Sequence, residues 1–139
     1  MDVVEVELAR VITQLKGEQY LYLREKEQGR SFPIVIGFHE VEEINRKLTG
    51  QQVPRPLTHD LMGRVIKTLG WRLTRVVITE IRDATFYANL VLVPGDAVGD
   101  KANGERLVDC RPSDAIALAV QTGARIFAAR DVIDALTAG

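Results

Sequence analysis

Residues 71–93 read WRLTRVVITEIRDATFYANLVLV, two long apolar segments separated by Asp83 and Ala84. The alternation of side chains predicts two strands, Trp71 to Arg82 and Thr85 to Val93, joined by a tight turn. One face of the second strand is entirely apolar, while the opposite face mixes polar and apolar side chains. We therefore expect strand 85–93 to be central in a sheet.

Three more strand segments precede this hairpin. An alternating segment begins at Val4, and its apolar phase shifts after Ala9, which predicts a bulge or a strong bend. The segments 20–25 and 33–37 follow as shorter strands, and the first of them is the expected hairpin partner of the initial strand.

Two helices are predicted between these strands and the long hairpin. Apolar residues recur every three or four positions over 39–48 and again over 58–69, and a glycine follows each segment. Thr58 is the expected N-cap of the second helix. The connector QQVPRP, residues 51–56, contains two prolines and is expected to be stiff and extended.

The C-terminal third alternates between the two kinds of element. The expected order is a polar hairpin loop (94–104), a strand (105–110), a buried helix that begins at Pro112 and ends before Gly123, a strand (125–129) and one or two closing helical turns (131–136). Together these elements predict an α+β fold. It is expected as a single domain over residues 1–139, with a mixed or antiparallel sheet of about six or seven strands and three main helices packed on it.

The composition narrows the classes of protein to consider. Hydrophobic residues make up 46% and charged residues 27%, as in globular domains, and no uncharged run approaches the ~20 residues of a membrane span. The formal net charge is −1, so any binding of phosphate must come from a local cluster of basic residues. The start of the chain does not resemble a signal peptide, and the single cysteine, Cys110, favours a reducing cytoplasm.

Two short segments carry the same pattern of residues. Each places an arginine and a proline before a hydroxyl and an acid at an expected helix start; the residues are Arg55, Pro56, Thr58 and Asp60 in one, and Arg111, Pro112, Ser113 and Asp114 in the other. Free N–H groups at a helix start, with an arginine beside them, can bind a phosphate. The same residues are also explained by ordinary helix capping, and this structural interpretation stays open.

Three other polar residues have competing interpretations. His59 falls on the apolar side of its helix, where a packed, hydrogen-bonded histidine is the common case. Asp60 lies in line with Arg64, with which a surface ion pair would explain it. Asp109 ends an apolar strand, so we expect it to be compensated by Arg111 or by His59. Cys110 is interpreted as a small buried hydrophobe, and His39 and Glu40 as surface residues.

Several long motifs resemble the bifunctional nuclease domain family. They are PIVIG (33–37), PRPLTHDL (54–61), ITEIRDATFYANL (78–90) and VDCRPSDAIALAV (108–120), and the resemblance extends over about residues 3–132. It implies an α+β fold with a mixed, strongly bent sheet and activity on both DNA and RNA. Some members of the family carry a C-terminal UVR-type helical segment, which is not expected after Gly139. The resemblance makes residues 58–60 and 109–114 site candidates.

Two catalytic routes follow from the chemistry of these candidates. In one, Asp60, Asp109 and Asp114 hold a divalent cation, Mg²⁺ or Mn²⁺, which activates water. In the other, His59 is the general base, oriented by Asp109, and arginines stabilise the developing charge. The three acids within two motifs favour the metal route. Arg55, Thr58, Arg111 and Ser113 are the candidate phosphate ligands in both routes, and no organic cofactor is expected.

A second class of function fits the same residues. The sites could bind a phosphorylated ligand or a partner protein without hydrolysis, as a regulatory module, because the sequence lacks the aromatic platform on which bases stack. Apolar residues such as Trp71, Tyr20 and Tyr22 exceed what the predicted core needs. This excess of apolar residues predicts that the chain forms a homo-oligomer, either a dimer or a multiple of a dimer.

Overall fold

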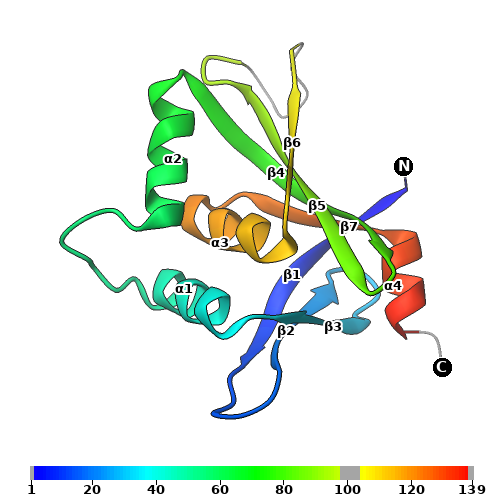
Figure 1. The fold of residues 1–139 in the computed structure, drawn as a ribbon. Helices are drawn as coiled ribbons and strands as arrows, with labels where there is room; N and C mark the ends of the chain where they lie inside the picture. The colour runs from blue at the N-terminus through cyan, green and yellow to red at the C-terminus, as the bar shows by residue number, and fades with distance from the viewer. Residues whose placement is uncertain (1, 98–103, 138–139) are drawn as a thin grey trace.

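The computed structural model describes residues 2–97 and 104–137 (Figure 1). The strands are β1 (Val3–Ile12), β2 (Gln19–Glu25), β3 (Ser31–Ile36), β4 (Trp71–Arg82), β5 (Thr85–Pro94), β6 (Arg106–Cys110) and β7 (Arg125–Ala129). The helices are α1 (Phe38–Thr49), α2 (Thr58–Thr68), α3 (Pro112–Thr122) and α4 (Arg130–Thr137). The predicted α+β class is confirmed, with four helices in place of three because the closing turns form α4. Of the predicted loop 94–104, residues 98–103 lie outside the described ranges.

The seven strands form one mixed sheet, in the order β3-β2-β1-β7-β4-β5-β6. All neighbours are antiparallel except β4 and β7, which are parallel. The central strand is β7, so the prediction that strand 85–93 is central was wrong. The apolar face of β5 is buried because α3 packs across β4 and β5. A helix can cover a strand in this way even when the strand is next to the edge of the sheet, so an apolar face does not identify the central strand.

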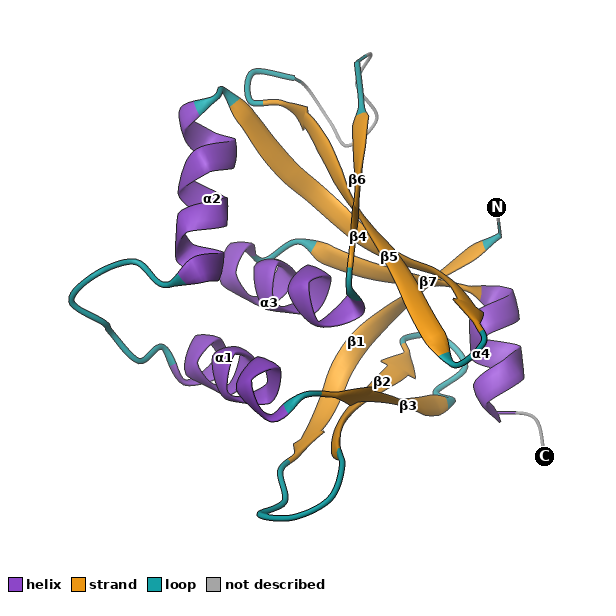
Figure 2. Cartoon of the chain, in the orientation of Figure 1, coloured by secondary structure: helices purple, strands orange, loops and turns teal. Residues whose placement is uncertain are grey.

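Local features of the strands follow the sequence closely. The turn of the β4–β5 hairpin is formed by Asp83 and Ala84, both with positive φ (51° and 62°), the backbone conformation of a tight two-residue hairpin turn. In β1 the pairing with β2 shifts between Leu8 and Arg10, at the predicted irregularity. The first half of β1 pairs with β7 and the second half with β2, and Figure 2 shows how strongly the sheet bends there.

The helices cover the core, and their packing brings the start of α2 close to the start of α3. α3 lies against the sheet, and α1 and α2 pack against α3 (Figure 2). α4 covers β3, β4 and β7 instead. Phe32, Leu21, Ile116 and Leu118 are among the fully buried side chains, each worth roughly 2 kcal/mol of burial. α2 begins one residue earlier than expected: Leu57 is the N-cap and Thr58 is the first helical residue.

Candidate functional site

The first turns of α2 and α3 meet through a buried histidine. His59 is 8% exposed, and its Nε2 lies 3.0 Å from Oδ1 of Asp114, within hydrogen-bond distance. The Nε2 of Gln121, at the end of α3, donates a hydrogen bond to the backbone carbonyl of His59. The predicted inward position of His59 is confirmed, and its partner is Asp114 rather than Asp109.

Asp114 receives several hydrogen bonds in addition to its contact with His59. The Arg111 side chain donates through Nε at 3.0 Å and Nη2 at 2.9 Å, and the Arg111 backbone N–H donates at 3.3 Å. Burial tends to raise the pKa of Asp114, but the bonds from Arg111 and His59 outweigh it and hold the pKa below its ordinary value. Asp114 is therefore a carboxylate that stays ionised beside the histidine.

Helix α1 adds two carboxylates to this site. Glu40 accepts a hydrogen bond from Arg111 Nη1 at 2.9 Å, and Glu43 Oε1 lies 3.6 Å from Nδ1 of His59. Hydrogen bonding to Asp114 and to Glu40 raises the pKa of Arg111. Glu40, expected to be a surface residue, is half-buried at this site, and Glu43 is a site residue that was not among the candidates. Their spacing of three residues on one helix face was the available signal.

These groups line a cavity of about 620 Å³, which we call the His59 cavity. Its walls are His39, Glu40, Glu43, Pro56, Leu57, Thr58, His59, Leu61, Arg111 and Asp114. Three acids and one arginine face the cavity, so its charge is predominantly negative. Such a site is suited to moving protons and poorly suited to attracting a phosphate by itself.

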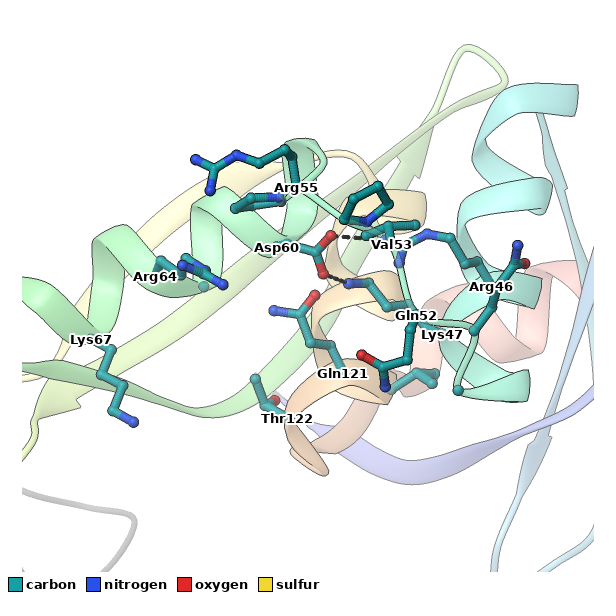
Figure 3. Close-up of a pocket in the computed structure, with 16 residues that line it drawn as sticks. Arg46, Lys47, Gln52, Val53, Arg55, Asp60, Arg64, Lys67, Gln121 and Thr122 are labelled. Carbon is teal, nitrogen blue, oxygen red and sulfur yellow. Dashed lines mark hydrogen bonds and ion pairs between the residues drawn. The ribbon is translucent and has the colours of Figure 1, made fainter.

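A second cavity, of about 560 Å³, lies on the other side of the start of α2, and we call it the basic cavity (Figure 3). Pro56 lines both cavities. Five basic side chains and one acid face the basic cavity: Arg46, Lys47, Arg55, Arg64, Lys67 and Asp60. Its charge is opposite to that of the His59 cavity, although the whole chain is nearly neutral.

Asp60 is the acid of the basic cavity, and it is heavily engaged. Its carboxylate accepts hydrogen bonds from Lys47, from Arg46 at 3.0 Å and from the backbone N–H of Leu57 at 2.9 Å. Burial tends to raise the pKa of Asp60, but the bonds from Lys47 and Leu57 lower it to about 2. The expected ion pair of Asp60 with Arg64 is replaced by contacts with the end of α1.

Other sequence predictions about the site need correction. Asp109 is exposed on β6, opposite Asn89. In the described part of the chain, Asp114 takes the place expected of Asp109 as the partner of both His59 and Arg111. A strand-end acid that faces solvent needs no compensation, so the premise of that pairing was wrong. Arg55 and Arg111, both candidate phosphate ligands, line different cavities. Thr58 is exposed in the His59 cavity, whereas Ser113 is buried (6% exposed).

The acids expected to hold a metal are dispersed. Asp60 is bound by two cations, Asp114 by Arg111 and His59, and Asp109 faces solvent. Within residues 2–97 and 104–137, no three His, Cys, Asp or Glu side chains are grouped closely enough to hold a metal ion. These residues therefore do not fit a resident divalent cation bound by the three predicted acids.

Cys110 lies beside the site without the properties of a nucleophile. It packs against the hydrophobic core, and burial, followed by the charges of Asp114 and Asp109, raises its thiol pKa to about 12. The interpretation of Cys110 as a small hydrophobe is consistent with this position.

Comparison with known proteins identifies the family. Residues 21–138 match the model of the bifunctional nuclease domain. The chain belongs to the bifunctional nuclease domain family. The match begins after β1, whereas the resemblance seen in the motifs extends to about residue 3. Two uncharacterized proteins of Mycobacterium tuberculosis, from different strains, are each 34% identical over 122 residues, which cover 88% of this chain and 68% of theirs. No helix in the described ranges has both the length and the hydropathy that a membrane span requires.

Proposed function

We propose that this member of the bifunctional nuclease domain family hydrolyses phosphodiester bonds in RNA and DNA, with the His59 cavity as its catalytic site. The observation that carries the proposal is the 3.0 Å contact between His59 and Asp114 at the wall of an open cavity. A histidine oriented by an ionised carboxylate is a common arrangement for general acid–base catalysis.

The proposed reaction assigns one role to each side of the histidine ring. Nε2 is occupied by Asp114, so Nδ1, on the side of Glu43, is the nitrogen that exchanges a proton with water. His59 takes a proton from the attacking water while the new P–O bond forms. The bond to the leaving oxygen breaks, and that oxygen receives a proton from the protonated His59 by way of water, which returns the histidine to its neutral form.

Arg111 is the group proposed to stabilise charge on the phosphate. Its side chain is 61% exposed, and its guanidinium is held in place by Asp114 and Glu40. A fixed guanidinium at the rim of a cavity can donate to phosphate oxygens without losing these contacts, because it has five N–H donors. Thr58, at the same cavity, is a second proposed phosphate ligand.

A divalent cation has no assigned step in this reaction, because the predicted acids do not converge. We therefore assign the catalytic role to His59 instead of the three acids. The test includes a measurement of cleavage in the presence of a chelator. Cleavage that withstands a chelator agrees with a histidine mechanism. Cleavage abolished by the chelator and restored by Mg²⁺ or Mn²⁺ would contradict it.

The proposal is tested by cleavage of end-labelled single-stranded RNA and DNA. His59→Gln and Asp114→Asn are expected to lower kcat by at least 100-fold, because they remove the proton acceptor and its orientation. Asp109→Asn is the matched control, because it neutralises an exposed acid that does not line the His59 cavity. It should leave cleavage unchanged. Equal cleavage by all three variants would assign the activity to a contaminant. Circular dichroism melting checks that each variant is folded.

A non-catalytic regulatory function is the alternative. It is favoured by one observation, the separation of the basic cavity from His59, since anion binding there requires no catalysis. In that case the wild-type protein would bind a phosphorylated ligand and cleave neither nucleic acid. The same assay, paired with a binding titration, distinguishes the two functions.

We also propose a cellular location and an oligomeric state for the protein. We expect a cytoplasmic protein, because its cysteine has no partner within the chain. We also expect copies of the chain to associate. Leu61 on α2, Leu69 directly after α2, and Leu107 on the edge strand β6 are 55%, 70% and 62% exposed. Apolar surface of this kind often marks an interface.

A further inference from the structure

We propose that the basic cavity binds a phosphate group of the nucleic-acid substrate and so positions the strand for the His59 cavity. The identity of the ligand rests on the proposed nuclease function; the anion site itself rests on the charges described below. The cavity lies between the end of α1, the connector 50–56, α2 and the end of α3.

The cations of the basic cavity fall into two groups. Arg46 and Lys47, from α1, are only 12% and 7% exposed at the side chain, and both are paired with Asp60. Arg46 also binds Glu43 at 2.8 Å. Because buried cations need such partners, this first group is explained by the fold alone.

The second group consists of Arg55, Arg64 and Lys67. All three are exposed, and none forms an ion pair with another residue in the described part of the chain. Figure 3 shows Arg64 and Lys67 along α2 and Arg55 before its start, while Arg46 and Lys47 lie on the other side of Asp60. Arg64 and Lys67 are three residues apart, so they share a helix face although like charges there repel each other. A bound anion would remove this repulsion.

The position of the cavity links it to the proposed chemistry. Asp60 and His59 are consecutive residues, and Pro56 lines both cavities. Gln121 lines the basic cavity and donates a hydrogen bond to the carbonyl of His59, which ties the two walls together. A strand whose phosphate lies in the basic cavity can therefore pass over the first turn of α2 and reach His59.

The electrostatics of the His59 cavity make a separate anchor necessary. Glu40, Glu43 and Asp114 outnumber Arg111 there, so a polyanion gains little by approaching that cavity alone. Attraction for the backbone must come from nearby cations, and the basic cavity supplies them. Phosphate contacts of this kind carry no sequence information, in agreement with a proposed activity on both RNA and DNA.

The test is a binding titration with fluorescein-labelled single-stranded dodecamers of RNA and DNA, followed by anisotropy at several salt concentrations. The full chain carries His59→Gln, so that no cleavage occurs during the measurement. Adding Arg64→Gln and Lys67→Gln together should weaken binding and flatten the log–log salt slope by about 0.7, the change expected when one phosphate is no longer neutralised. The matched control is Arg10→Gln with Lys16→Gln, which removes the same charge at the far end of β1. An unchanged slope in the Arg64, Lys67 variant would overturn the proposal.

Two further arms separate the possible outcomes. Dodecamers with a 5′-phosphate or a 5′-hydroxyl distinguish a terminal phosphate from an internal one: a preference for the 5′-phosphate that disappears in the Arg64, Lys67 variant assigns the cavity to the terminus. Cleavage kinetics are measured on protein that keeps His59, with and without the Arg64→Gln and Lys67→Gln substitutions. They distinguish failure of this inference from failure of the proposed function. Normal cleavage with an unchanged KM in the double variant would contradict the anchor alone. Loss of binding without any wild-type cleavage would support the anion site and contradict the nuclease.

Discussion

Asp114 connects three segments that are far apart in the sequence. Its carboxylate contacts His59 of α2 and Arg111 at the start of α3, and Arg111 in turn contacts Glu40 of α1. Each of these bonds is charge-assisted, and together they fix the histidine ring relative to the cavity. The precision of the candidate site therefore depends on one acid at the third position of a helix.

Asp60 occupies the same helical position in α2 and gives a prediction about acid stability. Its folded pKa of about 2 lies below the ordinary 3.8, so its contribution is present above about pH 4 and is lost as the pH falls through 2. Asp60→Asn should lower the free energy of unfolding at neutral pH by about 1–2 kcal/mol, after discounting for solvent screening. Urea denaturation across this pH range measures it.

The control for Asp60 is Asp109→Asn, which changes an exposed acid. The gap between wild type and Asp60→Asn should narrow as the pH falls from 4 to 2, while Asp109→Asn should follow the wild type throughout. A gap of constant size would mean that Asp60 acts through its shape or its hydrogen bond to Leu57 rather than through its charge.

Among the elements, α2 and α3 approach closely where Gly63 faces Gln121. A Cβ built on Gly63 would overlap the Nε2 of Gln121, the atom that bonds to the His59 carbonyl. Glycine in the interior of a helix is otherwise unfavourable by about 1 kcal/mol relative to alanine. Its presence is explained by the space that Gln121 requires.

This contact predicts a coupled pair of mutations. Gly63→Ala should stabilise the protein by about 1 kcal/mol when Gln121 is alanine, because only helix propensity changes. In the wild-type background the gain should disappear, since Gln121 must move and lose a hydrogen bond of similar value. A double-mutant cycle by chemical denaturation measures the coupling. Equal gains in the two backgrounds would show that the helices do not press on Gln121.

The elements themselves were largely predictable from the sequence, and their partners were not. Alternation identified β4 and β5, and the helical phase of His59 showed that it faces inward, because both depend on nearby residues. The contact of His59 with Asp114 joins residues 55 positions apart, which no local pattern encodes. The central place of β7 was missed for the same reason: its five residues gain their position from α3, which returns the chain to the middle of the sheet.

Across the whole molecule, the two edges of the sheet differ in their protection. Edge strand β3 contains Pro33, which lacks an N–H and disfavours pairing with another strand. Edge strand β6 has no proline, and its Leu107 and Val108 are 62% and 41% exposed. The predicted self-association is therefore expected at the β6 edge.

Light scattering at micromolar concentration tests this expectation. The wild type should have the mass of a dimer or a multiple of one, and Leu107→Glu should shift it toward the monomer, because a buried unpaired charge opposes association. Val35→Glu on β3, another exposed apolar edge residue (48%), is the control and should leave the mass unchanged. A monomeric wild type would contradict the prediction.

The place of β7 also governs the order in which the chain can fold during synthesis. β7 lies between β1 and β4, so until it has been made the sheet consists of two separate pieces, β3-β2-β1 and β4-β5-β6. The closing contacts join opposite ends of the sequence: Val3 pairs with Ala129, and the Arg130 N–H donates to the Asp2 carbonyl at 2.9 Å. Contacts over such distances form slowly, because the loop must be closed first. A nascent chain on the ribosome therefore carries two inner strands, β1 and β4, that each have one edge unpaired, and chaperone binding during translation would be directed at these edges.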